Sequence, residues 1–366
     1  MKLDIVIFGL AITSSWGNGH AVTYRALAKA LRERGHNVTF LERDTAWYRA
    51  HRDFDRVDYC DIALYRDLRE IPARFGARVM NADLVILGSY VPDGTVLAEW
   101  ITAHARGVTA FYDIDTPVTL AGFETGATAY MAAALVPRFD LYLSFTGGPV
   151  LHLIEEVYGA RRARALHCAA DLDVHQACEL PSEWELGYLG TYSADRQDAL
   201  ERFMFAPARE LTHQKFAVAG AQYPDNVEWP VNVARIPHLP PSAHRSFYGR
   251  QRYTLNLTRA DMIAAGYSPS VRLFEAAACG VPIISDNWAG LETFFTPGRE
   301  ILVVDQMQDV MHVLSELPEE RRRTIAAAAR NRLLKSHTPR HRAEQIENYY
   351  REVVAEQRPQ IREVVA

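Results

Sequence analysis

The sequence predicts an α/β protein with two doubly wound parallel sheets, each in a domain of its own. Short, continuous apolar runs recur along the chain with helix-like segments between them. This pattern restarts after a less regular stretch at residues 171–183. The 366 residues, 48% of them hydrophobic, suffice for about two cores. We therefore expect domains at residues 1–175 and 183–335, followed by a terminal segment at residues 339–366.

The first domain opens with a strand, a loop, a helix and a second strand. An apolar run from Leu3 to Ile12 predicts a buried strand, and Gly35 ends the helix that follows the loop. The next strand is expected at residues 38–41. Further strand-like runs occur at 83–88, 108–112 and 140–144. Because strands of a parallel sheet are buried on both faces, such continuous runs predict a sheet with helices on either side.

The second domain repeats this organisation. Its apolar runs lie at residues 186–190, 215–220, 253–257 and 281–285. In the segment 339–366, apolar residues recur at helical spacing, so we expect an amphipathic helix that packs back across the domain junction. Ligands of open parallel sheets bind at the carboxyl ends of the strands, so the loops that follow the strands are the expected sites.

Charge and cysteine content exclude several classes of function. The chain has 40 basic and 45 acidic side chains and a net charge of -5, so we expect no nucleic-acid partner. Its 4 cysteines are scattered without metal-ligand spacing, which favours a reduced, cytoplasmic protein. No apolar stretch approaches the roughly 20 residues of a transmembrane helix.

The strongest local signal lies between residues 266 and 282. Ser268 is suited to the N-cap of a helix and Pro269 to its first turn, and Gly280 ends it. The free N–H groups and positive dipole end of such a helix can bind phosphate oxygens. The hydroxyls of Ser268 and Ser270 would add hydrogen-bond donors.

Arg272 and Glu275 lie three residues apart in this helix and therefore near one another. One interpretation is a surface ion pair that contributes little stability. The other is a nucleotide site, in which Glu275 accepts hydrogen bonds from the ribose hydroxyls while Arg272 and the helix start hold the phosphates. The residues alone leave both interpretations open.

The run from Ser270 to Ser285 resembles the donor-binding signature of GT-B glycosyltransferases, particularly the branch related to the spore maturation protein CgeB. Segments 286–292 and 297–303 extend this resemblance. Residues 189–196 are similar to the loop that opens the nucleotide-binding domain of these enzymes. The resemblance implies two Rossmann-like domains facing across a cleft, with a nucleoside-diphosphate sugar bound by the second domain.

Carried over by position, the resemblance assigns roles within the second domain. It implies that Glu275 binds the ribose and that Arg272 and Arg196 approach the diphosphate. It also implies that Gly190 and Thr191 let the backbone come close to the ligand.

One position departs from the family pattern. Tyr267 stands eight residues before Glu275, where retaining members often carry a first glutamate. The resemblance therefore does not fix whether the sugar would be transferred with retention or inversion. GT-B enzymes as a class need no Asp-x-Asp metal site, so we expect no metal and no cofactor beyond the nucleotide-sugar substrate.

The loop after the first strand is a second candidate site. Gly17, Asn18 and Gly19 allow a tight turn and close backbone approach to a diphosphate or an acceptor hydroxyl. His20 follows, and the ordinary histidine pKa of about 6.5 suits it to take a proton from an acceptor hydroxyl. A structural, hydrogen-bonded histidine is the alternative interpretation.

Asp113 and Asp115 follow the predicted strand 108–112, at the edge where acceptor groups are expected. Either carboxylate can orient His20 or a sugar hydroxyl, or act as the base itself. Turn chemistry before a Thr-Pro pair explains them equally well, and two carboxylates one residue apart can also ligate a metal. We discount the metal on the grounds of the family resemblance.

Together these features predict a metal-independent, hexosyltransferase-like enzyme whose acceptor, a small molecule, glycan, lipid or protein, is bound by the first domain. A non-catalytic protein that binds a nucleotide sugar is one alternative. An NAD-dependent oxidoreductase is a weaker one. Its Gly-x-Gly start at residues 17–19 would use Glu42 as the ribose acid, but Val22 stands in place of the third glycine.

Overall fold

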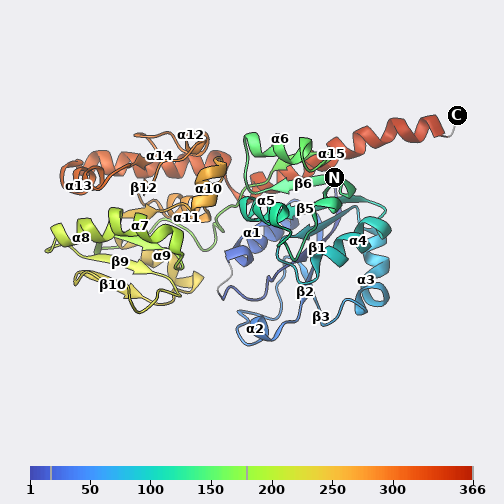
Figure 1. The fold of residues 1–366 in the computed structure, drawn as a ribbon, viewed down its shortest axis with the longest axis horizontal. Coiled ribbons are helices and arrows are strands. Elements are labelled where there is room, and N and C mark those ends of the chain that lie inside the picture. The colour runs from blue at the N-terminus through green and yellow to red at the C-terminus, as the bar shows by residue number, and fades with distance from the viewer. Residues whose placement is uncertain (17–18, 179, 365–366) are drawn as a thin grey trace. The chain divides into compact units, whose positions relative to one another are not determined.

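The computed structural model describes residues 1–16, 19–178 and 180–364, and the chain divides into two compact units (Figure 1). The N-terminal unit comprises Met1–Cys168 together with Pro339–Ala366. The C-terminal unit comprises Ala169–Thr338. None of the helices in the described part of the chain is long and apolar enough to cross a membrane.

The N-terminal unit contains a 7-stranded parallel sheet with the order β3-β2-β1-β4-β5-β6-β7. Its strands are β1 Asp4–Gly9, β2 Asn37–Arg43, β3 Asp61–Tyr65, β4 Leu84–Gly88, β5 Val108–Asp113, β6 Leu141–Ser144 and β7 Ala163–Ala165. The strand order reverses between β1 and β4. In doubly wound sheets, ligands commonly bind near the loops that follow the two strands at such a reversal.

Helices connect these strands, and the last helix of the chain returns to the same unit. They are α1 Gly19–Glu33, α2 Ala46–Arg49, α3 Glu70–Asn81, α4 Gly94–His104, α5 Thr116–Thr125, the 3-10 turn η1 Ala133–Arg138, α6 Pro149–Glu156 and α15 Pro339–Val364. The α1 helix ends before Gly35, whose φ of 90° suits glycine. The α15 helix packs against α1 and β5 (Figure 1).

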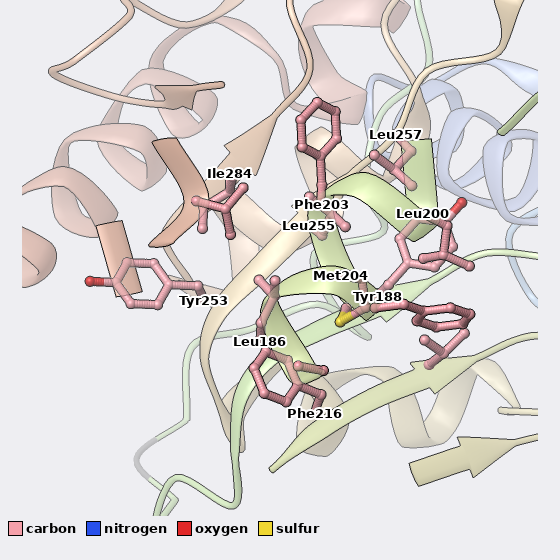
Figure 2. Close-up of a cluster of buried hydrophobic side chains, with 14 of the residues drawn as sticks. Leu186, Tyr188, Leu200, Phe203, Met204, Phe216, Tyr253, Leu255, Leu257 and Ile284 are labelled. Carbon is pink, nitrogen blue, oxygen red and sulfur yellow. The ribbon is translucent and has the colours of Figure 1, made fainter. Parts of the chain in front are cut away.

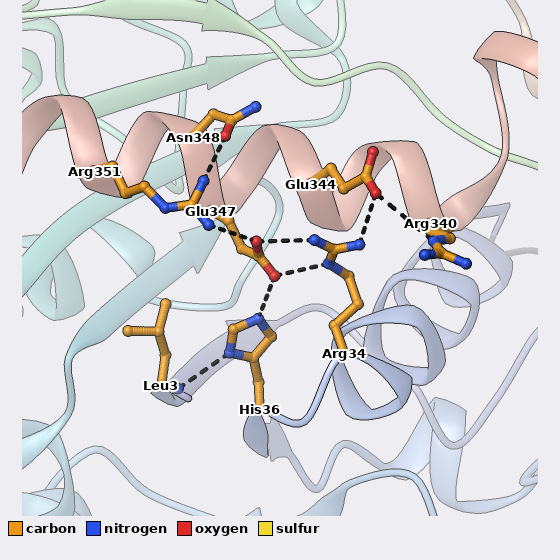
Figure 3. A network of polar contacts seen from close by, with 8 residues as sticks. All are labelled: Leu3, Arg34, His36, Arg340, Glu344, Glu347, Asn348 and Arg351. Atoms are coloured by element: carbon orange, nitrogen blue, oxygen red, sulfur yellow. Dashed lines mark hydrogen bonds and ion pairs between the residues drawn. The ribbon is translucent and has the colours of Figure 1, made fainter. Parts of the chain in front are cut away.

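A buried polar network holds α15 to the end of α1 (Figure 3). Arg34 donates to both oxygens of Glu347, at 2.7 and 3.0 Å, and to Glu344 at 2.7 Å. The backbone N–H of Leu3 donates to His36 Nδ1 at 3.1 Å, so Nε2 carries the ring proton and donates to Glu347 Oε1 at 2.9 Å. Glu347 thus links α15 to residues that flank the start of β1 and the start of β2.

The C-terminal unit contains a 6-stranded parallel sheet with the order β10-β9-β8-β11-β12-β13. Its strands are β8 Trp184–Leu189, β9 Phe216–Ala219, β10 Val233–Ile236, β11 Gln251–Asn256, β12 Ile283–Ser285 and β13 Leu302–Val303. Its helices are α7 Ala194–Leu200, the π-helical turn η2 Glu201–Phe205, α8 Ala206–Glu210, α9 Pro241–Gly249, α10 Ala260–Ala265, α11 Val271–Cys279, α12 Leu291–Phe294, α13 Met307–Glu316 and α14 Glu319–Ser336. The strand order reverses between β8 and β11.

The core on one side of this sheet fixes the two central strands (Figure 2). Leu186 and Tyr188 of β8 and Leu255 of β11 are almost fully buried against Phe203 and Met204 of η2. Burying a side chain of this size contributes about 1.5–3 kcal/mol relative to leaving it in water. The carboxyl ends of β8 and β11 are therefore rigidly placed, and the residues that follow them form the site described below.

Candidate functional site

The α11 helix begins two residues later than the sequence predicts. Its first residue is Val271, and Ser270, not Ser268, occupies the N-cap position. The hydroxyl of Ser270 donates to Asn256 Oδ1 at 2.6 Å, so no side chain caps the helix. Ser268 and Pro269 are buried ahead of it. The prediction of Ser268 as N-cap was wrong because the Asn256 contact holds residue 270 in an extended conformation.

An unusual backbone turn precedes this helix. Gly266 and Tyr267 both have positive φ, 65° and 49°, and the N–H of Tyr267 donates to the carbonyl of Ala289 at 2.6 Å. A Cβ at Gly290 would come within 2.4 Å of the Tyr267 ring. Gly290 therefore lets the ring lie against the backbone. A bulky residue at positive φ is uncommon and marks a segment that its surroundings constrain.

Arg272 lies at the carboxyl ends of β8 and β11, and its side chain is buried. Its Nε donates to the carbonyl of Leu189, and its Nη1 donates to Asn256 Oδ1 at 3.0 Å. The guanidinium also lies 4.8 Å from the centre of the Tyr188 ring. Within the described residues no carboxylate forms an ion pair with Arg272, and none accepts a hydrogen bond from Nη2.

Arg196, on α7, brings a second guanidinium to the same place. Its Nη2 donates to the carbonyl of Thr191 at 2.6 Å, whereas its buried Nε has no acceptor among the residues with described positions. Burial lowers the pKa of Arg196, and the nearby charge of Arg272 lowers it further. The two guanidinium groups repel each other, and no carboxylate of the described residues lies between them to offset this. An anion bound between them would relieve the repulsion.

The loop after β8 comes close to both guanidinium groups. A Cβ at Gly190 would lie 2.6 Å from Tyr188 Oη and 2.8 Å from Arg272 Nη2, so a larger residue would displace them. The carbonyl of Gly190 accepts a hydrogen bond from Tyr223 at 3.1 Å, and Thr191 beside it is exposed. The sequence thus places glycine where the backbone must approach Arg272.

Glu275 lies deeper in the unit and is 4% exposed. Tyr248 donates its hydroxyl to Oε2 at 3.2 Å, and His175 Nε2 lies 3.6 Å from Oε1. Burial opposes ionisation, but the charges of His175, His244 and Arg272 outweigh it and hold the pKa of Glu275 below its usual value. The interpretation of Arg272 and Glu275 as a surface ion pair was wrong, because both are buried and each has other partners.

In the N-terminal unit, His20 stands in the first turn of α1, which begins at Gly19. Its Nδ1 atom is buried, and burial lowers the pKa of His20 to about 4. The ring lies 5.3 Å from that of Tyr90, a residue with φ of 63° whose hydroxyl donates to Asp115 Oδ2 at 2.9 Å. Tyr90 therefore connects His20 to Asp115. The other two residues of the predicted loop, Gly17 and Asn18, fall outside the described part of the chain.

Asp113 is fully buried at the end of β5 and has a structural environment. Its carboxylate accepts hydrogen bonds from the hydroxyls of Tyr142 at 2.5 Å and Thr119 at 2.7 Å. The N–H of Asp115 donates to it at 3.3 Å. Burial raises the pKa of Asp113 to about 6 despite these donors. Asp113 thus ties β5 to β6 and α5, while Asp115 contacts the side chain next to His20.

The carboxylate of Glu42 is hydrogen-bonded to the loop that follows β1. One carboxylate oxygen accepts hydrogen bonds from the N–H groups of Ile12, at 2.8 Å, and Thr13, at 3.0 Å. The other accepts the hydroxyl of Thr13 at 2.6 Å. A ribose acid must accept hydrogen bonds from two hydroxyls, and three donors of the loop already bind the two oxygens of Glu42. This geometry weighs against the dinucleotide interpretation of the loop.

The sequence analysis missed several residues of these sites. His175, His244 and Tyr248 surround Glu275, and Tyr90 adjoins His20. They come from segments distant in sequence and carry no motif. Asn256 had a usable signal, because it is a polar residue at the end of an apolar strand.

Comparison with known proteins adds to this geometry. Residues 196–348 match the family model described as glycosyl transferase-like. Among curated proteins, the sequence has no significant match.

Solved structures align with the chain over nearly its whole length. Sucrose-phosphate synthase from Thermosynechococcus elongatus aligns with a TM-score of 0.67 and 14% identity, covering 97% of this chain and 100% of that one. An alpha-glucosyltransferase in complex with UDP-glucose and DNA containing an abasic site aligns with a TM-score of 0.70 and 12% identity, covering 95% and 100%. Anabaena HepE in complex with UDP and glucose aligns with a TM-score of 0.66 and 11% identity, covering 94% of this chain and 98% of that one. The chain therefore has the GT-B fold of glycosyltransferase structures, as the sequence predicts.

Proposed function

We propose that the protein is a glycosyltransferase, of the CgeB-like branch, which takes a sugar from a nucleoside diphosphate bound by the C-terminal unit. The acceptor would bind at the carboxyl ends of the N-terminal strands. The likeness of the fold to structures that contain UDP or UDP-glucose supports the donor class. The match of residues 196–348 to the glycosyl transferase-like model supports the reaction class.

The observation that carries this proposal is the pair of guanidinium groups at the ends of β8 and β11. Arg272 Nη2 and Arg196 Nε have no acceptor among the described residues. A diphosphate would accept hydrogen bonds from both, and from the uncapped N–H groups at the start of α11. The same donors would stabilise the negative charge that develops on the departing diphosphate. On this proposal no metal is needed to neutralise it.

The remaining donor contacts follow from the neighbouring residues. Glu275, held ionised, is proposed to accept hydrogen bonds from the ribose hydroxyls in place of its contacts with Tyr248 and His175. Residues proposed to complete the donor site are Ser268, Ser270, Tyr267, Gly190 and Thr191. Tyr267 stands where retaining relatives often carry a carboxylate, which leaves retention or inversion open, and a protein base is proposed for an inverting transfer.

For the transfer step, His20 is proposed as the base. The acceptor oxygen forms the new bond to the anomeric carbon, and the bond from that carbon to the diphosphate breaks with its electron pair. The acceptor proton passes to His20, which is neutral near pH 7 because burial lowers its pKa to about 4. Asp115, through Tyr90, is proposed to orient the acceptor or His20. Asp113 would position the end of β5.

The test is calorimetric titration of the protein with UDP, GDP and dTDP, followed by turnover assays with the corresponding nucleotide sugars. We expect one diphosphate to bind and its sugar conjugate to be transferred to an acceptor or slowly hydrolysed. Chelation of divalent ions should not lower the rate. If none of the three nucleotides binds, the proposal is wrong. Tight binding with neither transfer nor hydrolysis would instead identify a non-catalytic nucleotide-sugar-binding protein.

A further inference from the structure

Two histidines and a glutamate from separate segments of the C-terminal unit converge on one point. His175 Nε2 lies 3.2 Å from His244 Nδ1 and 3.6 Å from Glu275 Oε1. All three atoms lie within 4.8 Å of one another. His175 belongs to a turn before β8, His244 to α9 and Glu275 to α11. The donor role proposed above uses the glutamate but neither histidine.

The hydrogen bond on the far side of His175 fixes which of its nitrogens carries the proton. His175 Nδ1 lies 3.1 Å from the carbonyl oxygen of Asp171, and a carbonyl oxygen only accepts. Nδ1 is therefore the nitrogen that carries the proton whenever the ring is neutral, and Nε2 then directs a lone pair at His244 and Glu275. A histidine that donates one N–H to a backbone carbonyl and offers the other nitrogen is the usual arrangement of a metal ligand.

The other two ligands are also held in place. The backbone of Leu239 hydrogen-bonds the ring of His244. The hydroxyl of Tyr248 donates to Glu275 Oε2, which leaves Oε1 directed at His175. Without a metal, the 3.2 Å contact is satisfied when a neutral His244 donates its Nδ1–H to His175 Nε2. Metal binding requires His244 to carry its proton on Nε2 instead, so that both nitrogens and Glu275 Oε1 present lone pairs to the ion.

The separations suit a metal of ordinary size. Zn²⁺ binds nitrogen and oxygen ligands at about 2.0–2.1 Å, so neighbouring ligands of a tetrahedral site lie about 3.3 Å apart. Two of the three separations, 3.2 and 3.6 Å, lie close to this value, and the third, between His244 and Glu275, is within 4.8 Å. Two imidazoles and one carboxylate are also the donor set that zinc and similar ions prefer, with a fourth position left for water.

We propose that His175, His244 and Glu275 form a binding site for one divalent transition-metal ion of the Zn²⁺ class. His175 and Glu275 are buried, whereas His244 is partly exposed and gives the ion a route to the site. The ion would bind the carboxylate assigned above to the ribose, so it would compete with the donor and inhibit transfer. This competition rests on the proposed function, but binding of the metal does not.

The experiment measures metal binding to the metal-stripped, full-length protein without an activity assay. Zn²⁺ is titrated calorimetrically at pH 7.5, and Co²⁺ is followed by its visible absorption, which is intense in four-coordinate sites. We expect one ion per chain. His175→Ala and His244→Ala should each weaken binding by more than about 10-fold, since even outer-shell changes cost 10- to 100-fold. Glu275→Gln, which keeps the side-chain shape, should weaken it as well.

Matched controls separate this site from other ligands. His213→Ala removes an exposed histidine of the same unit, and Cys178→Ser removes the nearby partly exposed thiol. Both variants should bind the ion as the wild type does. Circular dichroism of each metal-free variant checks that it is folded, and the partly exposed His244 is the safest position for the test. Absence of a stoichiometric site, or loss of binding in the control variants alone, would overturn the proposal.

A final titration tests the competition. UDP is titrated into the wild type with and without saturating Zn²⁺, and we expect Zn²⁺ to weaken UDP binding by at least 10-fold. Unchanged UDP affinity with the metal bound would overturn the competition. Failure of UDP to bind even without Zn²⁺ would count against the proposed function and leave the metal site standing.

Discussion

At the scale of single residues, Arg196 gives the most direct test of the diphosphate site. It makes few contacts that hold the fold, since its side chain donates a hydrogen bond only to the carbonyl of Thr191 among the described residues. Arg196→Ala should weaken binding of the preferred nucleoside diphosphate roughly 10- to 100-fold, because a hydrogen bond to a charged group contributes about 1.5–3 kcal/mol. Calorimetry measures the effect. Arg202→Ala, an exposed arginine of the adjoining turn, is the control and should bind normally.

His20 gives a test of the base. A base must be unprotonated, and burial lowers the pKa of His20 to about 4. The kcat/KM of the wild type should therefore be level around pH 7 and fall only as the pH approaches about 4. His20→Ala should reduce turnover by roughly 10²- to 10⁴-fold and keep the donor affinity. A His20→Ala variant with wild-type turnover would exclude this role, whatever the shape of the pH profile.

At the scale of elements, the contact between α15 and α1 depends on Glu347 (Figure 3). Its pKa is lowered to about 2, chiefly by its hydrogen bond with Arg34. A carboxyl group whose pKa is lower in the folded state stabilises that state at pH values above about 4.5, its pKa in the unfolded chain. That contribution is lost as the pH falls toward 2.

Glu347→Gln should therefore reduce the stability of the N-terminal unit at pH 7 by about 1–3 kcal/mol, the usual cost of removing one partner of a buried polar group. The difference in free energy of unfolding between Glu347→Gln and the wild type should shrink as the pH falls from 4.5 to 2. Native-state hydrogen exchange of the α1 amides measures this free energy. Glu344→Gln is the control, because Glu344 is 41% exposed and should contribute less. An equal loss in both variants would contradict the central role of Glu347.

Whether a strand could be predicted from the sequence depended on whether it lies inside a sheet or at its edge. The strands at the edges of the two sheets, β3, β7, β10 and β13, were not predicted. They are short, and most of their residues are partly exposed. Strands buried on both faces need continuous apolar runs, but edge strands do not, so their sequences resemble loops.

At the scale of the whole molecule, the N-terminal unit is assembled from two separate stretches of chain. Ending the chain at Thr338 would remove α15 and uncover the apolar face of α1 and part of β5. We expect this truncation to lower amide protection in α1 and β5 and to leave β8 and β11 protected. Hydrogen exchange with mass spectrometry separates the two outcomes. Equal loss of protection in both units would show that they fold as a single cooperative body.

The sequence alone determined the fold class of this protein, because short apolar runs that alternate with helix-like segments are typical of parallel strands covered by helices. It also marked Gly190, which lies at the end of a predicted strand, and Arg272 and Glu275, which lie near the start of one predicted helix. Only the tertiary structure decided what these residues contact. Glu275 meets His175 and His244 from distant segments, and the Asn256 contact moves the start of α11, since burial and long-range hydrogen bonds are set by packing and not by local sequence.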